Sequence, residues 1–568
     1  MMGYIRNTGA DKTCGQTRRT LLALGRLVCG PALLAMAMNP ALAQTAPDRL
    51  KAIPTPDQLP SSLGTLEFTD GAPSAETAAR AYDYLDRMHA VESFVNAYRG
   101  ASTMSIFKGM KEAGIPNNTA LIFSDLMDSK SLFLTANADV IYFWVNLEFT
   151  EGPLVIETPP QSLGVIDDMW FRWVTDFGFP GPDRGEGGKY LLVPPGYKGE
   201  LPTYGYIVRK VRTNRAMVLG RSFLANEDPK PTVELIRKTL KIYPYLPGGL
   251  GTSIASALEG KATLARSKDN KLDWAFLRPE PPATFIEGTG KVINTIPPSD
   301  FSYYELLNEL VQQEPTDALD PEIMGSLAAI GIAKGKPFKP DARMKDILID
   351  AAAIGTAVSR TLNWRPRDSE GFYYYPDSAW MNMLFVGGYD FDAPPPEVSA
   401  DGTITVNPTT GARKLNARTA MFYYATGITP AMIMRLTGIG SQYLGAFFDS
   451  NGDYFDGGKT YKVTLPKGIP EEKFWSITAY DNQTRSMLAT PQLYPRAGSQ
   501  NYPGPAAVTS RDGSTTVFFG PEKPADAAAG NWIQTTPGKG WNMLLRLYSP
   551  LEPFFTKTWR PSEVEPVK

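Results

Sequence analysis

The segment 134–142 carries polar side chains at a spacing that could do acid–base chemistry. Thr135, Asn137 and Asp139 alternate, so they would share one face of an extended strand. On that face Asp139 could act as a general base, and Tyr142 could hold developing negative charge. The same Asn and Asp could instead satisfy backbone groups in a turn where a strand begins. Thr135 and Asn137 are thus candidate ligand contacts, Asp139 and Tyr142 are candidate catalytic residues, and the turn interpretation stays open.

A second segment, 167–176, mixes carboxylates, tryptophans and one arginine. Asp176 is a second candidate base, and Arg172 is a candidate ligand contact. The mixture suits a ligand cleft, because aromatic side chains supply apolar area and a few polar groups fix orientation. Surfaces of β-sandwiches carry the same mixture, so both interpretations are kept.

Two segments near the C-terminus pose a similar alternative. In 543–548, Arg546 and Tyr548 alternate with apolar residues that face the opposite side. Arg546 could stabilise negative charge in a site, or it could pair with a carboxylate of a neighbouring strand, which is the commoner arrangement. Together with the segment 474–481, this region supplies four candidate ligand contacts: Trp475, Tyr480, Asp481 and Tyr548.

Residues that most hydrolases and metalloenzymes rely on are scarce. The chain has one histidine, His89, and two cysteines, Cys14 and Cys29. The counts therefore argue against a Ser-His-Asp or Cys-His pair, a histidine-rich zinc site and a thiolate cluster. The run 438–440 begins like a dinucleotide fingerprint, but Tyr443 stands where the third glycine is needed. The sequence predicts no cofactor and leaves oxygen, amine and guanidinium groups for chemistry.

One acidic hairpin resembles part of a calcium loop. Asp449, Asn451 and Asp453 place oxygen-bearing side chains at alternate positions. An EF-hand loop needs glycine at its sixth position and glutamate at its twelfth, where this chain has Tyr454 and Thr460. An ordinary acidic hairpin is the favoured interpretation, so no metal site is predicted beyond this weak calcium candidate.

The first 43 residues have the pattern of a cleaved export signal. Arg18 and Arg19 precede an apolar stretch, 21–38, and the segment ends on Ala-Leu-Ala at 41–43, which a signal peptidase accepts. The paired arginines resemble a twin-arginine signal, but Arg26 inside the apolar stretch leaves the export route open. We expect a periplasmic or secreted protein without cysteines, because both cysteines lie in the segment that is removed.

Charge narrows the class of partner. Removing the signal takes away five basic residues and one acidic residue, which lowers the formal net charge from −2 to −6. An acidic balance argues against nucleic acid or an anionic membrane as a partner. No later stretch reaches the length of a membrane span, so no stable membrane insertion is expected after cleavage. A small-molecule ligand is the expected partner, and the oligomeric state is left open, a homodimer included.

The candidate segments need a scaffold, and the chain alternates between β-like and helical stretches. Short apolar runs divided by Gly/Pro turns predict strands from 119 to 220, and the last ~120 residues return to this pattern. Apolar spacing predicts helices at 75–115, 301–314 and 341–360. On the last helix six apolar residues share one face: Met344, Ile347, Leu348, Ala351, Ile354 and Val358.

These patterns predict a β-rich α+β protein, with two antiparallel sandwich or jelly-roll units around a helical middle region. The expected boundaries are a signal at 1–43, an extended leader at 44–74, an N-terminal domain at 75–245, a helical linking region at 246–440 and a C-terminal β domain at 441–568.

Several of these segments, taken in order, resemble a bacterial family that pairs domain of unknown function 1254 with domain of unknown function 1214. The run 135–142 is similar to that family's Thr-Pro-Asn-x-Asp-Thr-x-Tyr signature, with Ala136 in place of proline and Val140 in place of threonine. The run 187–197 is a second match. Further matches follow at the C-terminal end, at 474–481, 512–514, 531–532 and 546–550.

The resemblance covers nearly the whole chain after the signal. It implies an exported, multi-domain protein rich in β-sandwich, and it supplies no activity or cofactor. We carry nine residues over as signature positions without roles: Thr135, Asn137, Asp139, Tyr142, Trp475, Tyr480, Asp481, Arg546 and Tyr548.

Two functions follow from the residues and stay open beside each other. The first is binding of a small, partly apolar ligand in a cleft between the two β domains. The second is a histidine-free hydrolase or lyase that uses Asp139 or Asp176 as base and Arg546 or Tyr142 to hold negative charge. The second function requires a carboxylate with a raised pKa beside an oxyanion-stabilising donor in one pocket.

Overall fold

The computed structural model describes residues 53–246, 280–393, 397–398, 403–405 and 410–567. The predicted signal at 1–43, with Cys14 and Cys29, lies outside the described residues. The chain divides into one unit that ends at Ala78 and a second unit that runs from Ala79 to Lys568.

The first unit contains a small antiparallel sheet. Its strands are β1 (Gln58–Ser61), β2 (Gly64–Thr69) and β3 (Ala72–Pro73), joined by turns in which Gly64 and Gly71 adopt positive φ. The Ser61 hydroxyl donates to the Gly64 carbonyl oxygen at 2.8 Å and so closes the first turn. Where the sequence predicted an extended leader, these two turns fold part of the segment into paired strands.

Two helices replace the single helical stretch expected at 75–115. They are α2 (Ala75–Asn96) and α3 (Tyr98–Glu112), separated at Ala97. Twelve of the fifteen residues of α3 are buried, and they occupy every side of the helix. A helix that is buried all round belongs to the core of its domain.

The N-terminal domain is a sandwich of two sheets. The larger sheet has the order β13-β4-β5-β11-β7-β8, and the smaller has the order β10-β9-β6-β12. In the larger sheet the strands are β13 (Phe285–Glu287), β4 (Ala120–Ile122), β5 (Val140–Glu148), β11 (Arg215–Phe223), β7 (Ser162–Asp168) and β8 (Trp173–Gly178). In the smaller sheet they are β10 (Ile207–Lys210), β9 (Lys189–Val193), β6 (Leu154–Glu157) and β12 (Lys241–Pro244).

Alternation along β5 separates two cores in this domain. Ile141, Phe143 and Val145 point into the space between the two sheets, where helix α4 (Pro229–Thr239) also packs. Tyr142 and Trp144 point to the opposite face, which the helical region covers. One face of the larger sheet therefore lies outside the sandwich core and contacts the helical region.

The C-terminal domain repeats this plan. One sheet has the order β18-β24-β20-β21 and the other β23-β22-β19-β25. The first contains β18 (Ser441–Ala446), β24 (Trp541–Pro550), β20 (Glu471–Asp481) and β21 (Arg496–Gly498), and the second contains β23 (Trp532–Gln534), β22 (Thr515–Gly520), β19 (Tyr461–Leu465) and β25 (Glu565–Pro566). As predicted, Met543, Leu545 and Leu547 enter the sandwich core, which leaves Arg546 and Tyr548 on the other face of the sheet.

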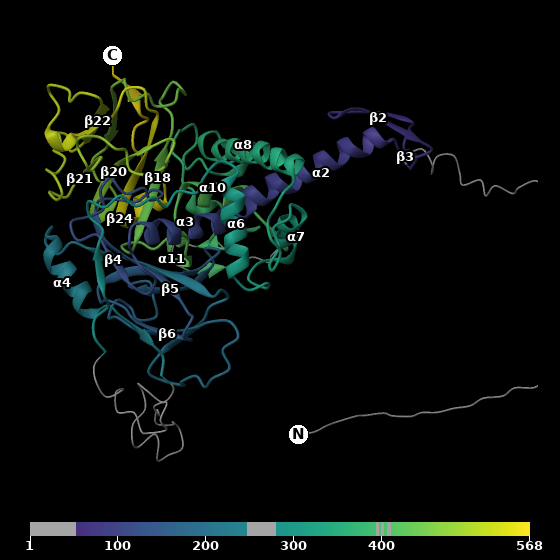
Figure 1. Cartoon of the computed structure of the whole chain (residues 1–568). Helices are drawn as coiled ribbons and strands as arrows, with labels where there is room; N and C mark the ends of the chain where they lie inside the picture. The colour runs from purple at the N-terminus through teal and green to yellow at the C-terminus, as the bar shows by residue number, and fades with distance from the viewer. Residues whose placement is uncertain (1–52, 247–279, 394–396, 399–402, 406–409, 568) are drawn as a thin grey trace, which may run out of the picture. The chain divides into compact units, whose positions relative to one another are not determined.

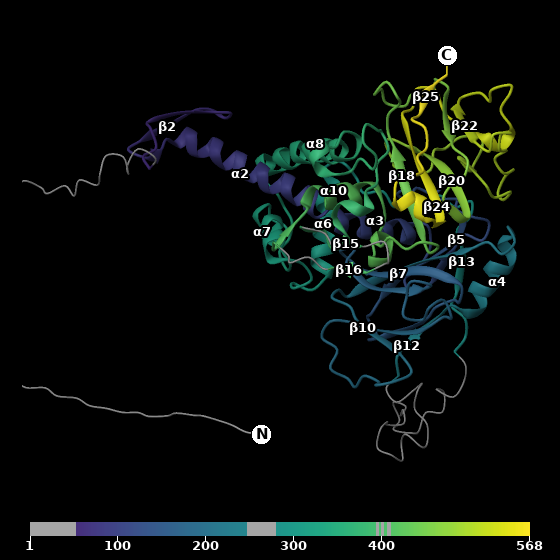
Figure 2. The ribbon, with the colours of Figure 1, turned by 180° about the vertical axis from the view of Figure 1, so that it is seen from behind.

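Helices fill the middle of the chain and lie beside both β domains (Figure 1; Figure 2 shows the reverse side). They are α6 (Ser302–Gln313), α7 (Pro321–Ala329), α8 (Ala342–Trp364), α9 (Leu384–Gly387), α10 (Leu415–Tyr424) and α11 (Pro430–Ile433), with α12 (Glu552–Phe555) near the end of the chain. Short elements complete the described chain: the pairs β14 (Asp392–Ala393) with β17 (Ala412–Arg413) and β15 (Glu397–Val398) with β16 (Ile404–Thr405), and 3-10 turns at Asp368–Glu370 and Ala529–Asn531.

Helix α8 differs from its prediction in which side is buried. It begins where expected, because the Asp341 carboxylate accepts a hydrogen bond from the Met344 amide at 2.7 Å. However, Ile354 and Val358 are exposed, and Gly355 lies against the ring of Phe94 from α2. Gly355 is buried in this close approach, and the buried side of the helix includes small residues that the apolar pattern did not count.

The predicted class is confirmed: the protein is α+β and β-rich, with a sandwich at each end and helices between them. One strand departs from the predicted boundaries, because β13, from the linking region, pairs in parallel with β4 of the N-terminal sheet. Among the helices that the structure describes, none is long and apolar enough to cross a membrane.

Candidate functional site

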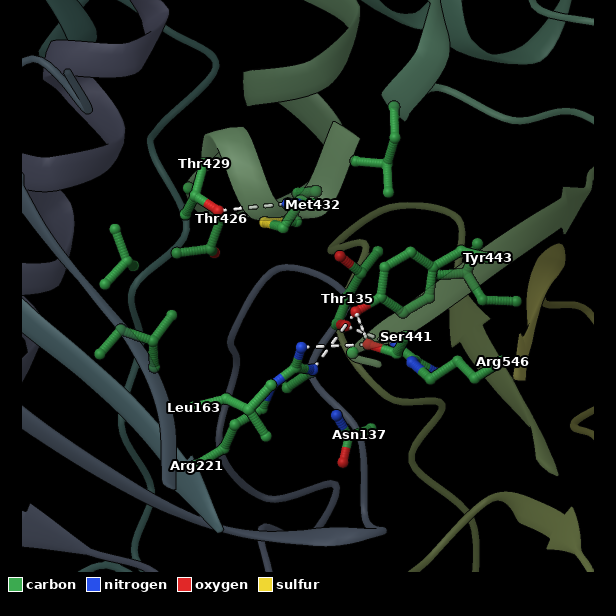
Figure 3. Close-up of a pocket in the computed structure, with 18 of the residues that line it drawn as sticks. Thr135, Asn137, Leu163, Arg221, Thr426, Thr429, Met432, Ser441, Tyr443 and Arg546 are labelled. Carbon is green, nitrogen blue, oxygen red and sulfur yellow. Dashed lines mark hydrogen bonds between the residues drawn. The ribbon is translucent and has the colours of Figure 1, made fainter. Parts of the chain in front are cut away.

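A cavity of about 190 Å³ lies between the outer face of the N-terminal six-stranded sheet and the outer face of the C-terminal sheet. Residues of helices α9, α10 and α11 line its third side. Figure 3 shows one of them, Met432. Its lining residue Ile439 is 48% exposed, so the cavity meets solvent near this position.

Strand register sets the floor that the N-terminal domain contributes. One row of four residues, each paired with the next across neighbouring strands, lines the cavity. The row consists of Asp176 on β8, Val165 on β7, Leu219 on β11 and Trp144 on β5. The next row of the same face carries Leu163, Arg221 and Tyr142, which also line it: these three are paired across β7, β11 and β5. The polar members therefore stand among apolar neighbours whose positions the sheet determines.

The C-terminal sheet supplies the facing wall by the same logic. Tyr443 on β18 is paired with Arg546 on β24, and Gly445 is paired with Leu544. Ser441, two residues before Tyr443, faces the same side. Alternation thus brings a hydroxyl, a phenol and a guanidinium to the cavity from two neighbouring strands.

The remaining wall is apolar and rich in methionine. Most of it comes from segments around α9, α10 and α11. Five methionines line the cavity: Met127, Met381, Met383, Met421 and Met432. Flexible thioethers can repack around ligands of different shape, so this wall favours an adaptable apolar contact.

Two arginines meet at one end of the cavity. Arg221 donates to the Ser441 hydroxyl at 3.0 Å and to the Tyr443 hydroxyl at 3.2 Å, and these two hydroxyl oxygens are 2.7 Å apart. The guanidinium of Arg546 lies 5.7 Å from the centre of the Tyr443 ring. Figure 3 shows Arg221 and Arg546 approaching Ser441 and Tyr443 from opposite sides.

Arg546 is held by neutral oxygens. It donates to the Thr135 carbonyl at 2.8 Å, to the Thr478 hydroxyl at 3.1 Å and to the Tyr480 hydroxyl at 2.5 Å. Among the described residues, no carboxylate forms an ion pair with Arg221 or Arg546. The end of the cavity formed by Arg221, Arg546, Ser441 and Tyr443, called the cationic end below, therefore keeps its positive charge.

Two tyrosines of the same cavity respond to their surroundings in opposite directions. Burial raises the pKa of the Tyr142 phenol. Burial also acts to raise the pKa of Tyr443, but Arg221, the Ser441 hydrogen bond and Arg546 outweigh it, so the pKa of Tyr443 is lowered overall. Divergent pKa shifts within one pocket are common where proteins bind charge or transfer protons.

Asp176 lines the cavity on a different strand and in a different row from Arg221. Burial raises the pKa of its carboxyl to about 7, although Thr429, Trp173 and the Ala431 amide each act to lower it. Neighbouring Asp167 also has a raised pKa, through burial and through repulsion from Asp168 and Asp176. Asp176 is thus a buried carboxyl that exchanges its proton near neutral pH.

Asp139, a predicted candidate base, takes a structural position instead. It is buried, it is not part of the cavity wall, and its carboxylate lies 2.7 Å from the Arg496 guanidinium. Its second oxygen accepts hydrogen bonds from Ser476 at 2.6 Å and from Tyr548 at 3.0 Å. All three partners belong to the C-terminal domain, so Asp139 joins the two β domains.

Other candidates divide between the wall and its support. Thr135, Asn137, Tyr142, Asp176 and Arg546 line the cavity. Tyr480 stands directly behind the wall, where it donates to the Ala136 carbonyl at 2.7 Å and receives a hydrogen bond from Arg546.

Three predicted ligand contacts lie outside the cavity wall, two of them in ion pairs and one in a hydrophobic core. Arg172 pairs with Asp168 at 2.7 Å, in a tight turn. Trp475 is buried in the core of the C-terminal sandwich. Asp481 pairs with Lys539 at 2.9 Å. With Tyr548 bound to Asp139, these residues do not belong to the cavity wall.

The weak calcium candidate, Asp449, Asn451 and Asp453, lies in a turn. The Asp449 carboxylate accepts hydrogen bonds from the amides of Asn451 and Asp453 at 2.8 and 3.1 Å, as turn-forming aspartates do. Within the described ranges, no group of three or more His, Cys, Asp or Glu side chains could hold a metal ion.

Three residues of the cationic end escaped sequence reasoning: Arg221, Ser441 and Tyr443. Arg221 alternates with small residues on its strand, but Gln442 stands between Ser441 and Tyr443, so the alternation that identified Arg546 is not present there. Their convergence depends on strand order and on the meeting of two domains, neither of which a single sequence displays.

Comparison with known proteins confirms the predicted domain pairing. The model of a protein family of unknown function, DUF1254, matches residues 117–244, and that of a second such family, DUF1214, matches residues 440–552. The chain thus carries both domains in the predicted order. No curated protein matches the chain.

Two solved structures are similar over most of their length. The VPA0106 protein from Vibrio parahaemolyticus is 16% identical, with a TM-score of 0.47, and the match covers 85% of this chain and 100% of that one. An uncharacterised protein from Burkholderia cenocepacia is 10% identical, with a TM-score of 0.35, and the match covers 87% of this chain and 97% of that one.

Proposed function

We propose that this chain, which pairs the two domains of unknown function, is an exported protein that binds a small, partly apolar ligand in the cavity between its β domains. The observation that carries the proposal is the composition of that cavity: an apolar wall with polar groups gathered at one end. Such walls bind small molecules by apolar burial and orient them with a few polar contacts. The first 43 residues support export, because they have the pattern of a cleaved signal.

The volume limits the ligand. An engineered apolar cavity of about 150 Å³ binds benzene. A cavity of about 190 Å³ therefore suits a molecule the size of a substituted benzene or a short acyl chain. Larger molecules would have to extend past Ile439 towards solvent.

Val165→Phe is expected to abolish ligand binding, because the larger ring would fill the middle of the cavity floor. A thermal-shift screen with small apolar and amphipathic compounds provides the measurement. A ligand at a hundredfold excess over its Kd adds about 2.7 kcal/mol to the stability of the wild-type protein. The control is Val508→Phe, at a position that is 60% exposed and outside the cavity, and it should keep the full shift. Equal shifts in the two variants, or no stabilising compound at all, would contradict the proposal.

Asp176 supports a second function, a histidine-free hydrolase or lyase. Its pKa of about 7 suits a general base or acid near neutral pH, and the arginines of the cationic end could hold developing negative charge. β8 and β11 are separated by β7, so their axes are roughly 10 Å apart. A substrate would have to span this distance, with its charged group towards Arg221 and its reacting proton towards Asp176.

If Asp176 is the base, activity on a panel of small esters should rise with pH and level off above about 7. Asp176→Asn should then lower kcat/KM at least ~100-fold. Asp346→Asn, which changes an exposed carboxylate on α8, is the matched control and should leave kcat/KM unchanged. A wild-type rate in Asp176→Asn would rule out this function and leave ligand binding in place.

A further inference from the structure

We infer that the ligand is a small organic anion, a carboxylate or a group of similar shape and charge, whose head is held by Arg221 and Arg546. The inference rests on the proposed ligand binding and names the class of ligand. Its apolar body would lie against the methionine-rich wall, and its head at the cationic end.

The first step is the charge balance of the cavity. Both guanidiniums are directed to neutral oxygens, namely hydroxyls and one carbonyl. The carboxylate of Asp139 is committed to Arg496 at 2.7 Å. A buried charge without a counter-ion is costly, and proteins usually pair it or use it to bind the opposite charge. The charge of Asp139 acts on Arg546 through space, but no described carboxylate forms an ion pair with either guanidinium. A negatively charged ligand would therefore complete the site.

The second step is the supply of hydrogen-bond donors. Arg546 is 2% exposed, and its buried Nε has no acceptor among the described residues. Ser441 and Tyr443 share one contact at 2.7 Å, which uses only one of their two hydroxyl protons. The other proton is available to a ligand. A guanidinium N–H and a hydroxyl are the donors that a carboxylate oxygen accepts best.

The pKa of Tyr443 is a third observation in favour of an anionic ligand. Its pKa is lowered by Arg221 and Arg546 even though burial opposes ionisation. The cationic end therefore already favours negative charge on a neighbouring oxygen, as an anion-binding site must. A carboxylate, which is ionised at neutral pH without help, gains from the same field.

The apolar walls add a condition on the body of the ligand. Beyond the cationic end, Leu163, Val165, Leu219 and Leu544 continue the apolar lining across both sheets. A fully hydrated inorganic anion would leave this surface unfilled. Benzoate or hexanoate, which join a charged head to a compact apolar body, match both parts.

The test compares charged probes with neutral ones of the same shape by calorimetric titration of the protein. The pairs are benzoate with benzamide and hexanoate with hexanamide, and inorganic phosphate tests charge alone. We expect wild-type protein to bind each carboxylate at least tenfold more tightly than its amide, and phosphate more weakly than both carboxylates. Arg221→Met should reduce the preference below twofold. Arg221→Lys, which keeps a cation, should preserve most of it, and Arg511→Met, on an exposed turn outside the cavity, should preserve all of it.

The outcomes separate this inference from the function on which it rests. Equal binding of amide and carboxylate, lost in Val165→Phe, would overturn the anion and leave cavity binding intact. Tighter phosphate than benzoate would overturn the partly apolar ligand as well. No binding of any probe would overturn the inference, and ligand binding itself would then stand or fall on the library screen. If Arg221→Met does not fold, the wild-type preference between acid and amide still decides the question.

Discussion

Asp139→Ala is expected to lower the free energy of unfolding by about 3–5 kcal/mol, the loss typical of removing one partner of a buried ion pair. Asp139 and Arg496 are both buried, and their charged groups are 2.7 Å apart. The substitution would leave Arg496 as an uncompensated charge and remove the acceptor that Ser476 and Tyr548 use. Because these partners lie in the other β domain, the loss should also loosen the contact between the domains.

Denaturant unfolding at neutral pH measures this effect, and an exposed pair provides the control. Asp83 pairs with Arg343 at 2.7 Å, but both side chains are nearly half exposed. Asp83→Ala should therefore cost less than about 1 kcal/mol. In a double-mutant cycle, Arg496→Met should cost much less when Asp139 is already alanine, because the buried charge has gone. A cost below about 1 kcal/mol for Asp139→Ala would show that the pair does not link the domains.

The local pattern of the strands was predictable, because alternation depends only on neighbouring residues. Met543, Leu545 and Leu547 on one side, with Arg546 on the other, follow directly from the period of a β-strand. Thr135 and Asn137 line the cavity, but they do so from a loop, where Thr135 has positive φ, and not from the strand that was expected. The turn interpretation that was kept open for this segment describes its backbone better, since the Asn137 side chain accepts a hydrogen bond from the Asp139 amide.

Long-range pairing was beyond prediction for a physical reason. The sequence shows that Asp139 and Arg546 carry charge, but their partners lie on other strands or loops, far away along the chain. Asp139 meets Arg496, whereas Arg546 meets only neutral oxygens. Which of the two charges is neutralised, and which is left for a ligand, therefore depends on tertiary packing. The sequence offered Asp139 and Asp176 equally as bases and missed Arg221, because the pattern could not distinguish these cases.

Replacing Asp176 with asparagine is expected to stabilise the protein at high pH, and this result would separate its electrostatics from any ligand. Asp176 is buried, and its pKa in the folded state is about 7, against 3.8 for an ordinary aspartate. Because folding raises the pKa of this carboxyl, the folded state is more stable with Asp176 protonated than with Asp176 ionised. The contribution of Asp176 to the free energy of unfolding is fully present below pH 3.8. It is lost as the pH rises through about 7, because the unfolded chain ionises this carboxyl in water without the penalty of burial.

The size of the effect follows from the same two pKa values. The full difference corresponds to about 4 kcal/mol at pH 8, where the native carboxyl is forced to ionise. At pH 5 only part of this cost has accumulated, so the stabilisation by Asp176→Asn should be roughly 2–3 kcal/mol larger at pH 8 than at pH 5. Urea unfolding of both proteins at the two pH values measures it, with Asp346→Asn as the exposed control expected to change stability by less than ~0.5 kcal/mol. Equal stabilisation at both pH values would mean that Asp176 ionises normally in the folded protein. The cavity would then hold an ordinary carboxylate, and the case for a proton-transferring base at that position would fail while the cationic end remained as described.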